Sequence, residues 1–280
     1  MPGIRVVTDS AADLPKGRAD ELGIEVVPLT FRFGSEEFVD GRDLTAQQFW
    51  QRCDASPTLP ETAAPSPGQF EEAFRRLAND GADGIVCVHL SAGLSATGQA
   101  AELGAKAVAD AAPVRIIDSR SVSLGQGQIA MGAAAAAAGG ASLDEVSAVV
   151  DDLVARTRLY ASLDTLDNLK KGGRIGGAKA MVATMLSFKP VIAVNGGHVE
   201  EEAKPRTRTR SLNHLIELVR AAGAVEHLAV VHSEAPDLEE FLDRIGEVFP
   251  RHDVLVGDVG GVIGTHAGRG AIGVTFQVPQ

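Results

Sequence analysis

Short apolar runs alternate with amphipathic stretches of helical length along the first half of the chain. The runs at 4–7, 84–89 and 114–117 are short enough to be buried strands, and stretches with helical spacing separate them. Strands joined by helices pair in parallel, and a parallel sheet needs helices on both of its faces. The alternation therefore predicts an α/β fold with a doubly covered parallel sheet in an N-terminal domain, residues 1–158.

The rest of the chain, residues 159–280, is expected to form a second α/β domain built on a mixed sheet. The turn sequence Asn-Gly-Gly at 195–197 lies between runs at 191–194 and 198–202, which predicts an antiparallel hairpin. Strands are also expected at 160–163, 228–232, 253–259 and 271–276, and helices at 209–222 and 236–248. A hairpin among strands that alternate with helices makes the sheet mixed.

Glycine and proline residues mark further boundaries in the N-terminal domain. Pro15 is expected to start a helix that Gly23 ends, and a strand over 24–33 contains Pro28, which places that strand at a sheet edge. A Pro-rich loop is expected at 57–67. Helices are expected after Asp43, at 70–77, after Ser95, at 129–138 and at 143–156.

The composition argues against several classes of protein. Of the 280 residues, 45% are hydrophobic and 22% are charged, which is typical of a globular chain with a sizeable core. A net charge of −11 repels phosphate backbones, and 4% aromatic residues leave few side chains for base stacking, so no nucleic-acid partner is expected. Cys53 and Cys87 form no CxxC or Cys/His spacing, which argues against a disulfide framework and a structural zinc site. A cytoplasmic location is the default expectation.

Residues 121–143 carry no charge over a length that could span a bilayer. This stretch is mostly Ala and Gly with some Ser and Gln, so its transfer into lipid would be weakly favourable at best. A tightly packed internal helix is the better interpretation. The first residues show no charged segment followed by an apolar one, so no secretory signal is expected.

The catalytic and cofactor motifs that the sequence suggests fail on their context. Gly268, Gly270 and Gly273 match GxGxxG, but a strand is expected after them, where a dinucleotide-binding turn requires a helix. The sequence contains no GxxxxGK[ST], HExxH or GxSxG pattern, and its seven His are scattered without metal-ligand spacing. We therefore expect neither a cofactor nor a metal ion.

Hydroxyl side chains follow three of the predicted parallel strands, where open α/β sheets form their ligand crevice. They are Thr8, Ser10, Ser91, Ser95, Ser119 and Ser121. Each one alone is explained by helix capping, for which Ser and Thr are preferred. As a group, without a nucleophile-activating partner, they favour recognition of an anionic or polar head group.

Five segments of the chain resemble the DegV family in order and spacing. They are Val7–Pro15, Thr62–Gly68, Ser91–Thr97, Asp164–Gly176 and Ile263–Gly268. The resemblance implies a two-domain α/β fold that binds one long-chain fatty acid between the domains. It also implies a non-catalytic carrier that presents the acyl chain to a separate fatty acid kinase, which forms the acyl phosphate for phospholipid synthesis. Such a role leaves room for transient contact with a membrane.

The resemblance also assigns the candidate site, position by position. Thr62 and Ser95 match hydroxyls that bind the carboxylate, and His266 matches a His beside the head group. Arg174 and Arg206 match Arg residues expected near the phosphate or the kinase surface. Thr265, beside His266, and Ser91, at a strand end, are further candidate donors. The chain departs from the family pattern at 63–64, where Ala-Ala replaces the usual Ser-Gln.

Two further features suit this interpretation but have simpler explanations. Met181, Met185, Leu186 and Phe188 recur at helical spacing after the Gly-rich loop and could line an acyl tunnel or form ordinary core. Arg206, Arg208 and Arg210 would share one side of an extended segment and could meet phosphate or an acidic partner, or form a solvated basic edge.

Two alternative functions remain open at this stage. The family is structurally related to the substrate-binding domain of dihydroxyacetone kinases, in which a His binds the substrate covalently. An enzyme that acts on a small phosphorylated or hydroxylated metabolite, with His266 as nucleophile, is therefore the alternative. A transcriptional or surface interaction protein is the third, and only the Arg cluster supports it.

Overall fold

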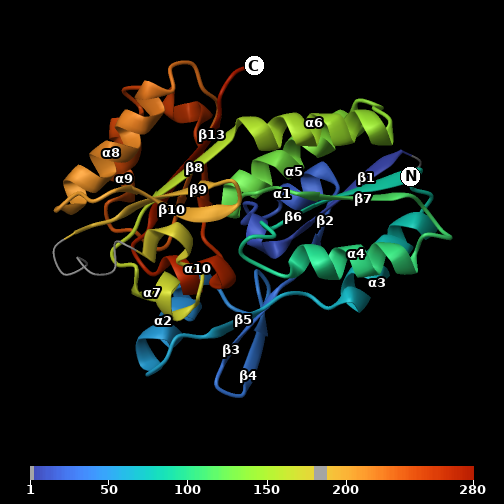
Figure 1. Ribbon diagram of the computed structural model, residues 1–280, viewed down its shortest axis with the longest axis horizontal. Helices are drawn as coiled ribbons and strands as arrows, with labels where there is room; N and C mark the ends of the chain where they lie inside the picture. Colours follow the sequence, from blue (N-terminus) through green and yellow to red (C-terminus); the bar gives the residue numbers. More distant parts are fainter. Residues whose placement is uncertain (1–2, 180–187) are drawn as a thin grey trace.

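The computed structural model describes residues 3–179 and 188–280. A four-stranded sheet in the order β2-β1-β6-β7 forms the first half of the molecule (Figure 1). Its strands are β1 (Ile4–Asp9), β2 (Ile24–Val27), β6 (Gly84–His89) and β7 (Val114–Asp118). All three pairings are parallel, which confirms the sheet type predicted from the alternating sequence.

Helices cover both faces of this sheet because successive residues of each strand point to opposite sides. Val6 packs with Ile129 and Val146, on the side of α5 (Ser123–Ala138) and α6 (Leu143–Arg156). Val7 packs with Phe70, on the side of α3 (Pro67–Asn79) and α4 (Thr97–Ala107). Helix α1 (Arg18–Leu22) begins three residues later than Pro15, and Gly23 caps it with φ 64°. Helix α5 begins at 123, six residues before the predicted start.

The second sheet has six strands in the order β10-β9-β8-β13-β11-β12. They are β8 (Thr157–Ser162), β9 (Val191–Asn195), β10 (His198–Ala203), β11 (Glu226–His232), β12 (Leu255–Asp258) and β13 (Ile272–Gln277). Only β11 and β12 pair in parallel among them, and β9 and β10 form the predicted antiparallel hairpin. The mixed sheet is thereby confirmed.

Helices α8 (Arg208–Ala221) and α9 (Leu238–Ile245) cover one face of the second sheet, and their apolar residues share a core with Val230, Val274 and Phe276. Helix α5 contacts strands of both sheets and so lies between them. Because α8 and α9 occupy only one face, the opposite face of β8, β9 and β13 is left to the junction between the sheets (Figure 1).

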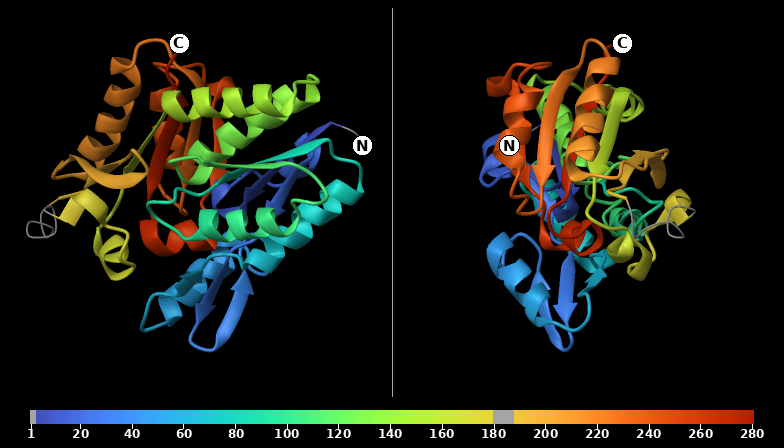
Figure 2. Two further views of the ribbon diagram at one scale, coloured as in Figure 1. Left: turned by 45° about the vertical axis from the view of Figure 1, so that its right-hand side comes forward. Right: turned by 90° about the vertical axis from the view of Figure 1, so that its left-hand side faces the viewer.

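A third, small sheet projects from the lower end of the molecule (Figure 2). It has the order β4-β3-β5, with β3 (Thr30–Phe33), β4 (Glu36–Val39) and β5 (Glu61–Ala63), and it packs with α2 (Ala46–Ala55) through the rings of Phe31, Phe38 and Phe49. The prediction of one strand over 24–33 was wrong. The chain leaves the first sheet at Pro28, which has no N–H to continue the ladder, and resumes as β3 in the small sheet.

One other local prediction was wrong, and the condition attached to another is not met. The Pro-rich segment 57–67 contains the strand β5, which pairs with β3 and carries Thr62 opposite Phe31. The segment with Arg206, Arg208 and Arg210 is not extended, because Thr207 caps α8 with its hydroxyl and Arg208 is already helical.

The remaining short helices include η1 (Ser10–Ala12), α7 (Asp167–Lys171) and η3 (Arg251–Asp253). Another, α10 (Gly261–Ala267), includes His266, which the sequence analysis placed in a Gly-rich loop. Across residues 3–179 and 188–280, no helix combines the length and apolar character needed to cross a bilayer. The predicted tunnel residues Met181, Met185 and Leu186 lie outside the described residues.

Candidate functional site

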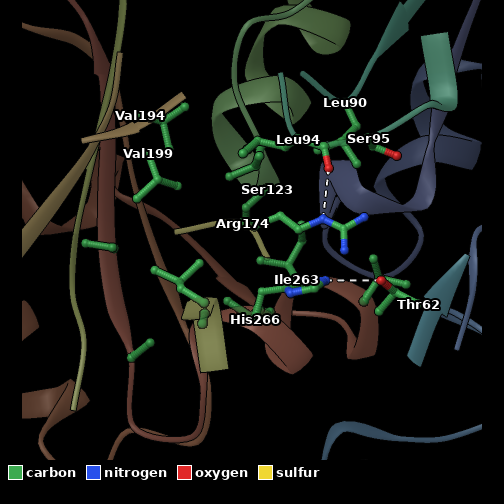
Figure 3. Close-up of a pocket in the computed structure, with 18 of the residues that line it drawn as sticks. Thr62, Leu90, Leu94, Ser95, Ser123, Arg174, Val194, Val199, Ile263 and His266 are labelled. Carbon is green, nitrogen blue, oxygen red and sulfur yellow. Dashed lines mark hydrogen bonds between the residues drawn. The ribbon is translucent and has the colours of Figure 1, made fainter. Parts of the chain in front are cut away.

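A largely apolar cavity lies where the two large sheets and the small sheet meet (Figure 3). Its empty volume, including the solvent at the open mouth, is about 960 Å³. The second sheet contributes most of the wall on one side, with Leu159, Ala161, Ile192, Val194, Val199, Val231 and Gly273. The opposite side is lined by Leu90, Leu94 and Val122, from the segments that follow β6 and β7, and by Val262 and Ile263 from α10.

The polar side chains of this cavity gather at one end. Thr62, Ser95, Arg174 and His266 line it together, although they come from β5, the segment before α4, the Gly-rich loop and α10. In Figure 3 the guanidinium of Arg174 lies between Ser95 and the Thr62–His266 pair, while Val194 and Val199 lie at the far side. The arrangement offers hydrogen-bond donors and one positive charge to the end of a ligand whose remainder is apolar.

His266 is held in place by neighbours on two sides. Its Nε2 lies 3.1 Å from Thr62 Oγ1. The opposite ring edge fits against Gly172, where a Cβ would lie 2.3 Å from His266 Nδ1. Burial, with a smaller contribution from the charge of Arg174, lowers the pKa of His266 to about 4. The imidazole is therefore neutral near pH 7, and its buried Nδ1 has no hydrogen-bond partner among the described residues.

Arg174 is oriented by main-chain carbonyls. Its Nε donates to the carbonyl of Leu94 at 3.2 Å, and its Nη1 donates to the carbonyl of Gly172 at 2.7 Å. Over the described ranges no carboxylate forms an ion pair with it. A half-buried guanidinium with only neutral partners retains its attraction for an anion.

Ser95 has two roles in its segment. Its hydroxyl lines the cavity and also accepts from the N–H of Thr97 at 3.3 Å, while lying 2.9 Å from Thr97 Oγ1 at the start of α4. This Ser therefore bonds to the first residue of α4 and also lies at the head of the cavity, but it does not cap the helix, because the N-cap of α4 is Ala96.

Three of the predicted site residues lie away from the cavity lining. Ser91 is buried and donates to the carbonyl of Gly197 at 2.7 Å. Thr265 donates to the carbonyl of Gly261 one turn earlier in α10. Arg206 is exposed, with its guanidinium 6.0 Å from the centre of the Phe188 ring.

Most other hydroxyls at strand ends also bond within the protein. Thr8 donates to the carbonyl of Val88, Ser10 to Asp40 and Ser119 to the carbonyl of Ser121. Their grouping at strand ends thus reflects turns and sheet closure more than a shared ligand.

Sequence reasoning missed Ser123, which lines the cavity at the start of α5. Its backbone has φ 51°, an uncommon conformation for a residue other than glycine, and its hydroxyl donates to Asp13 at 2.5 Å. The motif departure at Ala63 and Ala64 does belong to this site, because both residues line the cavity beside Thr62. They make its rim less polar than a Ser-Gln pair would.

Comparison with known proteins agrees with these motifs. The family model described as "Uncharacterised protein, DegV family" matches residues 3–278. This chain belongs to the DegV family. A DegV domain-containing protein of Streptomyces coelicolor is 38% identical over 278 residues, which are 98% of each chain. One from Mycobacterium bovis is 34% identical and covers 98% of this chain and 96% of its own length.

Solved structures of DegV proteins share the whole fold. The fatty-acid-binding DegV protein of Thermus thermophilus superimposes with a TM-score of 0.91 at 31% identity, covering 99% of this chain and 100% of its own. The DegV protein of Bacillus subtilis, described as a fatty acid binding protein, gives 0.88 at 27% identity with 99% of both chains covered. The Eubacterium eligens family member, which was loaded with heptadecanoic acid, gives 0.84 at 27% identity, with 99% and 100% covered.

The described residues present no metal centre, since none of their His, Cys, Asp and Glu side chains form a group of three or more suited to hold an ion. The polar side chains that line the cavity offer hydroxyls, one neutral imidazole and one guanidinium.

Proposed function

We propose that this DegV protein binds a long-chain fatty acid in the cavity between its sheets. The carboxylate lies against Thr62, Ser95, Arg174 and His266, and the acyl chain extends along β8, β9 and β13. One observation carries the proposal: a single cavity has apolar walls throughout and one polar end, whose only cation has no carboxylate partner among the described residues. A molecule with one acidic end and a long apolar remainder is complementary to the polar end and to the apolar walls.

The acyl tail and the carboxylate of the ligand contribute differently to the free energy of binding. A sixteen-carbon acid has about 14 methylenes, and at roughly 0.8 kcal/mol for each buried CH₂ the gross gain is about 11 kcal/mol before ordering costs. Hydrogen bonds to a charged group contribute about 1.5–3 kcal/mol each, and desolvation of the carboxylate offsets most of this. The tail therefore supplies affinity, and the head group fixes orientation.

The relatives support a ligand of this class. The proteins from Thermus thermophilus and Bacillus subtilis are described as fatty acid binding, and the one from Eubacterium eligens was loaded with a seventeen-carbon acid. Ala63 and Ala64 are compatible with this ligand, since neither hydroxyl nor amide is needed next to Thr62 to complete the set of donors.

The finer proposal concerns what happens to the bound acid. The protein acts as a cytoplasmic, non-catalytic carrier that presents the carboxylate to a separate fatty acid kinase, after transient contact with a membrane as the source or destination of the lipid. Its two domains, divided near residue 158, provide the opposite walls of the site. The neutral imidazole of His266, which is bonded to the Thr62 hydroxyl, suits a hydrogen bond with the head group.

Denaturing extraction of the purified protein followed by mass spectrometry tests binding. We expect one C14 to C18 fatty acid per chain, and stripped protein should rebind palmitate. Recovery of no acid under conditions that retain ligand, with no rebinding, would overturn the proposal.

The carrier role needs a separate measurement. Palmitate-loaded protein mixed with ATP and a fatty acid kinase should give acyl phosphate, which hydroxylamine traps. Formation of an adduct mass with a short ketose on His266 would instead favour the enzyme alternative.

A further inference from the structure

Two buried carboxyls lie behind the polar end of the cavity, at the start of the helix that carries His266. Asp13 follows η1 and is 8% exposed, and Asp40 follows β4 and is 4% exposed. Neither is among the cavity-lining residues, and the proposed contacts with a carboxylate do not use them. Burial of a carboxyl costs free energy unless the group is hydrogen-bonded, and both of these carboxyls are.

Asp13 joins α10 to the cavity wall at α5. One carboxyl oxygen, Oδ1, accepts from the N–H of Gly260 at 2.9 Å, and the other accepts from the Ser123 hydroxyl at 2.5 Å. Gly260 immediately precedes α10, and Ser123 lines the cavity in its strained conformation with φ 51°. The single side chain of Asp13 therefore fixes two parts of the site relative to each other.

Asp40 joins the same helix to the small sheet that carries Thr62. Its Oδ1 accepts from the N–H of Val262 at 3.3 Å, and its Oδ2 accepts from the Ser10 hydroxyl at 2.8 Å. The Ser10 oxygen in turn accepts from the N–H of Leu29 at 3.0 Å, and the Asp40 N–H donates to the carbonyl of Leu29 at 3.0 Å. Leu29 precedes β3, the strand that pairs with β5 and Thr62.

Both carboxyls lie next to Gly260. A Cβ on Gly260 would lie 2.9 Å from Asp13 Oδ1 and 3.2 Å from Asp40 Oδ1, so the pair leaves no room for a side chain there. Burial raises the pKa of both groups, and the charge of Asp40 raises that of Asp13 further, against the lowering effect of their hydrogen bonds. Asp9, whose pKa burial raises to about 6, is a third acidic neighbour.

We propose that Asp13 and Asp40 are positioning residues for the head group: together they hold α10 so that His266 meets Thr62 at the mouth of the cavity. The inference rests on the proposed function for its ligand. It assigns the pair no contact with the ligand. Loss of the pair should let α10 move, separate His266 from Thr62 and hydrate the imidazole.

Three variants test the role of Asp13. Asp13→Leu removes both acceptors at similar size. Asp13→Asn keeps a carbonyl for the Gly260 N–H and offers its amide to the Ser123 oxygen, so it should restore the arrangement. Asp43→Asn is the matched control: Asp43 also accepts a main-chain N–H, from Val39 at 2.7 Å, but it is exposed and does not contact α10.

Two measurements need no ligand. In Asp13→Leu we expect the NMR titration of His266 to move from a pKa of about 4 toward the ordinary value of about 6.5. We also expect the emission of Trp50, the single Trp, to shift to the red, because this ring packs against α10, where a Cβ on Gly264 would lie 3.2 Å from Trp50 Cζ2. Asp13→Asn and Asp43→Asn should match the unmodified protein in both.

A third measurement uses carboxyl-labelled [1-¹³C]palmitate. In Asp13→Leu the carboxyl resonance should shift toward that of Thr62→Val, and affinity should fall about threefold to tenfold, as for the loss of one or two hydrogen bonds. If the unmodified protein binds no palmitate, the proposed function fails. The two ligand-free measurements would still test whether Asp13 and Asp40 position α10.

Gly260→Ala covers the case in which Asp13→Leu does not fold. Its Cβ pushes the two carboxyls apart without removing either, and it should move the His266 titration and the Trp50 emission in the same directions. The inference is overturned if folded Asp13→Leu or Gly260→Ala keeps both signals unchanged, or if Asp43→Asn changes them equally.

Discussion

The two ends of the cavity are built in different ways. Its apolar wall comes mainly from neighbouring strands of one sheet, β8, β9 and β13, whose residues are placed by regular pairing. Its polar end is assembled from four segments, and each side chain there is held by its own contact. The apolar wall should therefore be sensitive to volume, and the polar end to single hydrogen bonds that are each worth less.

Filling the apolar wall should have the largest effect. Ala161 lies in β8 opposite Gly273, and both residues line the cavity. In Ala161→Leu the larger side chain would displace about four methylenes of the ligand, a loss of about 3 kcal/mol or roughly 100-fold in palmitate affinity. Calorimetric titration of palmitate and decanoate measures this, and decanoate should lose less because its chain is shorter.

Ala107→Leu is the control for that substitution, because Ala107 is exposed at the end of α4. It should bind both acids normally. An equal loss for palmitate and decanoate in Ala161→Leu would contradict the assignment of β8 to the tail.

The next largest effect should come from the pH dependence of His266. Its pKa is about 4 in the folded protein, against about 6.5 when unfolded, so the unfolded chain binds the proton first as the pH falls. The unmodified protein should lose stability relative to His266→Gln between about pH 6.5 and pH 4, by up to about 3 kcal/mol. Urea unfolding at several pH values gives this difference.

The comparison with His266→Gln matters because other buried groups act in the opposite direction. Burial raises the pKa of Asp9 to about 6, so its contribution is lost as pH rises through that value. Both proteins contain Asp9, and the difference between their curves cancels it. A difference that does not change with pH would mean that the imidazole is not buried in neutral form.

Removal of the positive charge should have an intermediate effect. Arg174→Met should weaken palmitate binding about tenfold through loss of a charge-assisted hydrogen bond, and should leave hexadecanol binding nearly unchanged. It should also raise the pKa of His266, since the charge of Arg174 contributes to lowering it. Lys171→Met, three residues earlier and exposed, is the control. Equal losses for the acid and the alcohol would remove Arg174 from the head-group end.

Periodicity predicted the two large sheets because strand and hairpin signals are local. The runs at 84–89 and 191–194 and the turn at 195–197 are strands and a turn in the structure. The break at Pro28 and the strand β5 escaped prediction, because a three-residue strand in a Pro-rich segment has no period of its own and forms only against β3.

In the candidate site, too, some residues could be predicted from sequence motifs and others depend on contacts between distant segments. The family motifs identified Thr62, Ser95, Arg174 and His266, which come together at one end of the cavity. The placement of Ser91 and Thr265 depends on which carbonyl lies nearest in space, and Ser91 finds that of Gly197, more than 100 residues away in the chain. Likewise the links from Asp13 to Ser123 and Gly260 join distant segments, and no local pattern predicts them.

The smallest effect should come from Ser95→Ala, which separates orientation of the head group from affinity of the tail. Removal of this hydroxyl should weaken palmitate binding only about threefold, since the acyl chain supplies most of the affinity. It should slow acyl-phosphate formation more, because a misoriented carboxylate reaches the kinase less often in the right geometry. Stability should fall by about 1 kcal/mol, since the hydroxyl also accepts from the N–H of Thr97.

Ser142→Ala is the matched control, because Ser142 caps α6 through the N–H of Glu145 at an exposed position far from the cavity. It should lose similar stability with normal palmitate affinity and a normal rate of phosphorylation. If Ser95→Ala behaves like Ser142→Ala in all three measurements, Ser95 serves only to stabilise the start of α4 through Thr97, and Thr62, Arg174 and His266 alone define the polar end of the cavity.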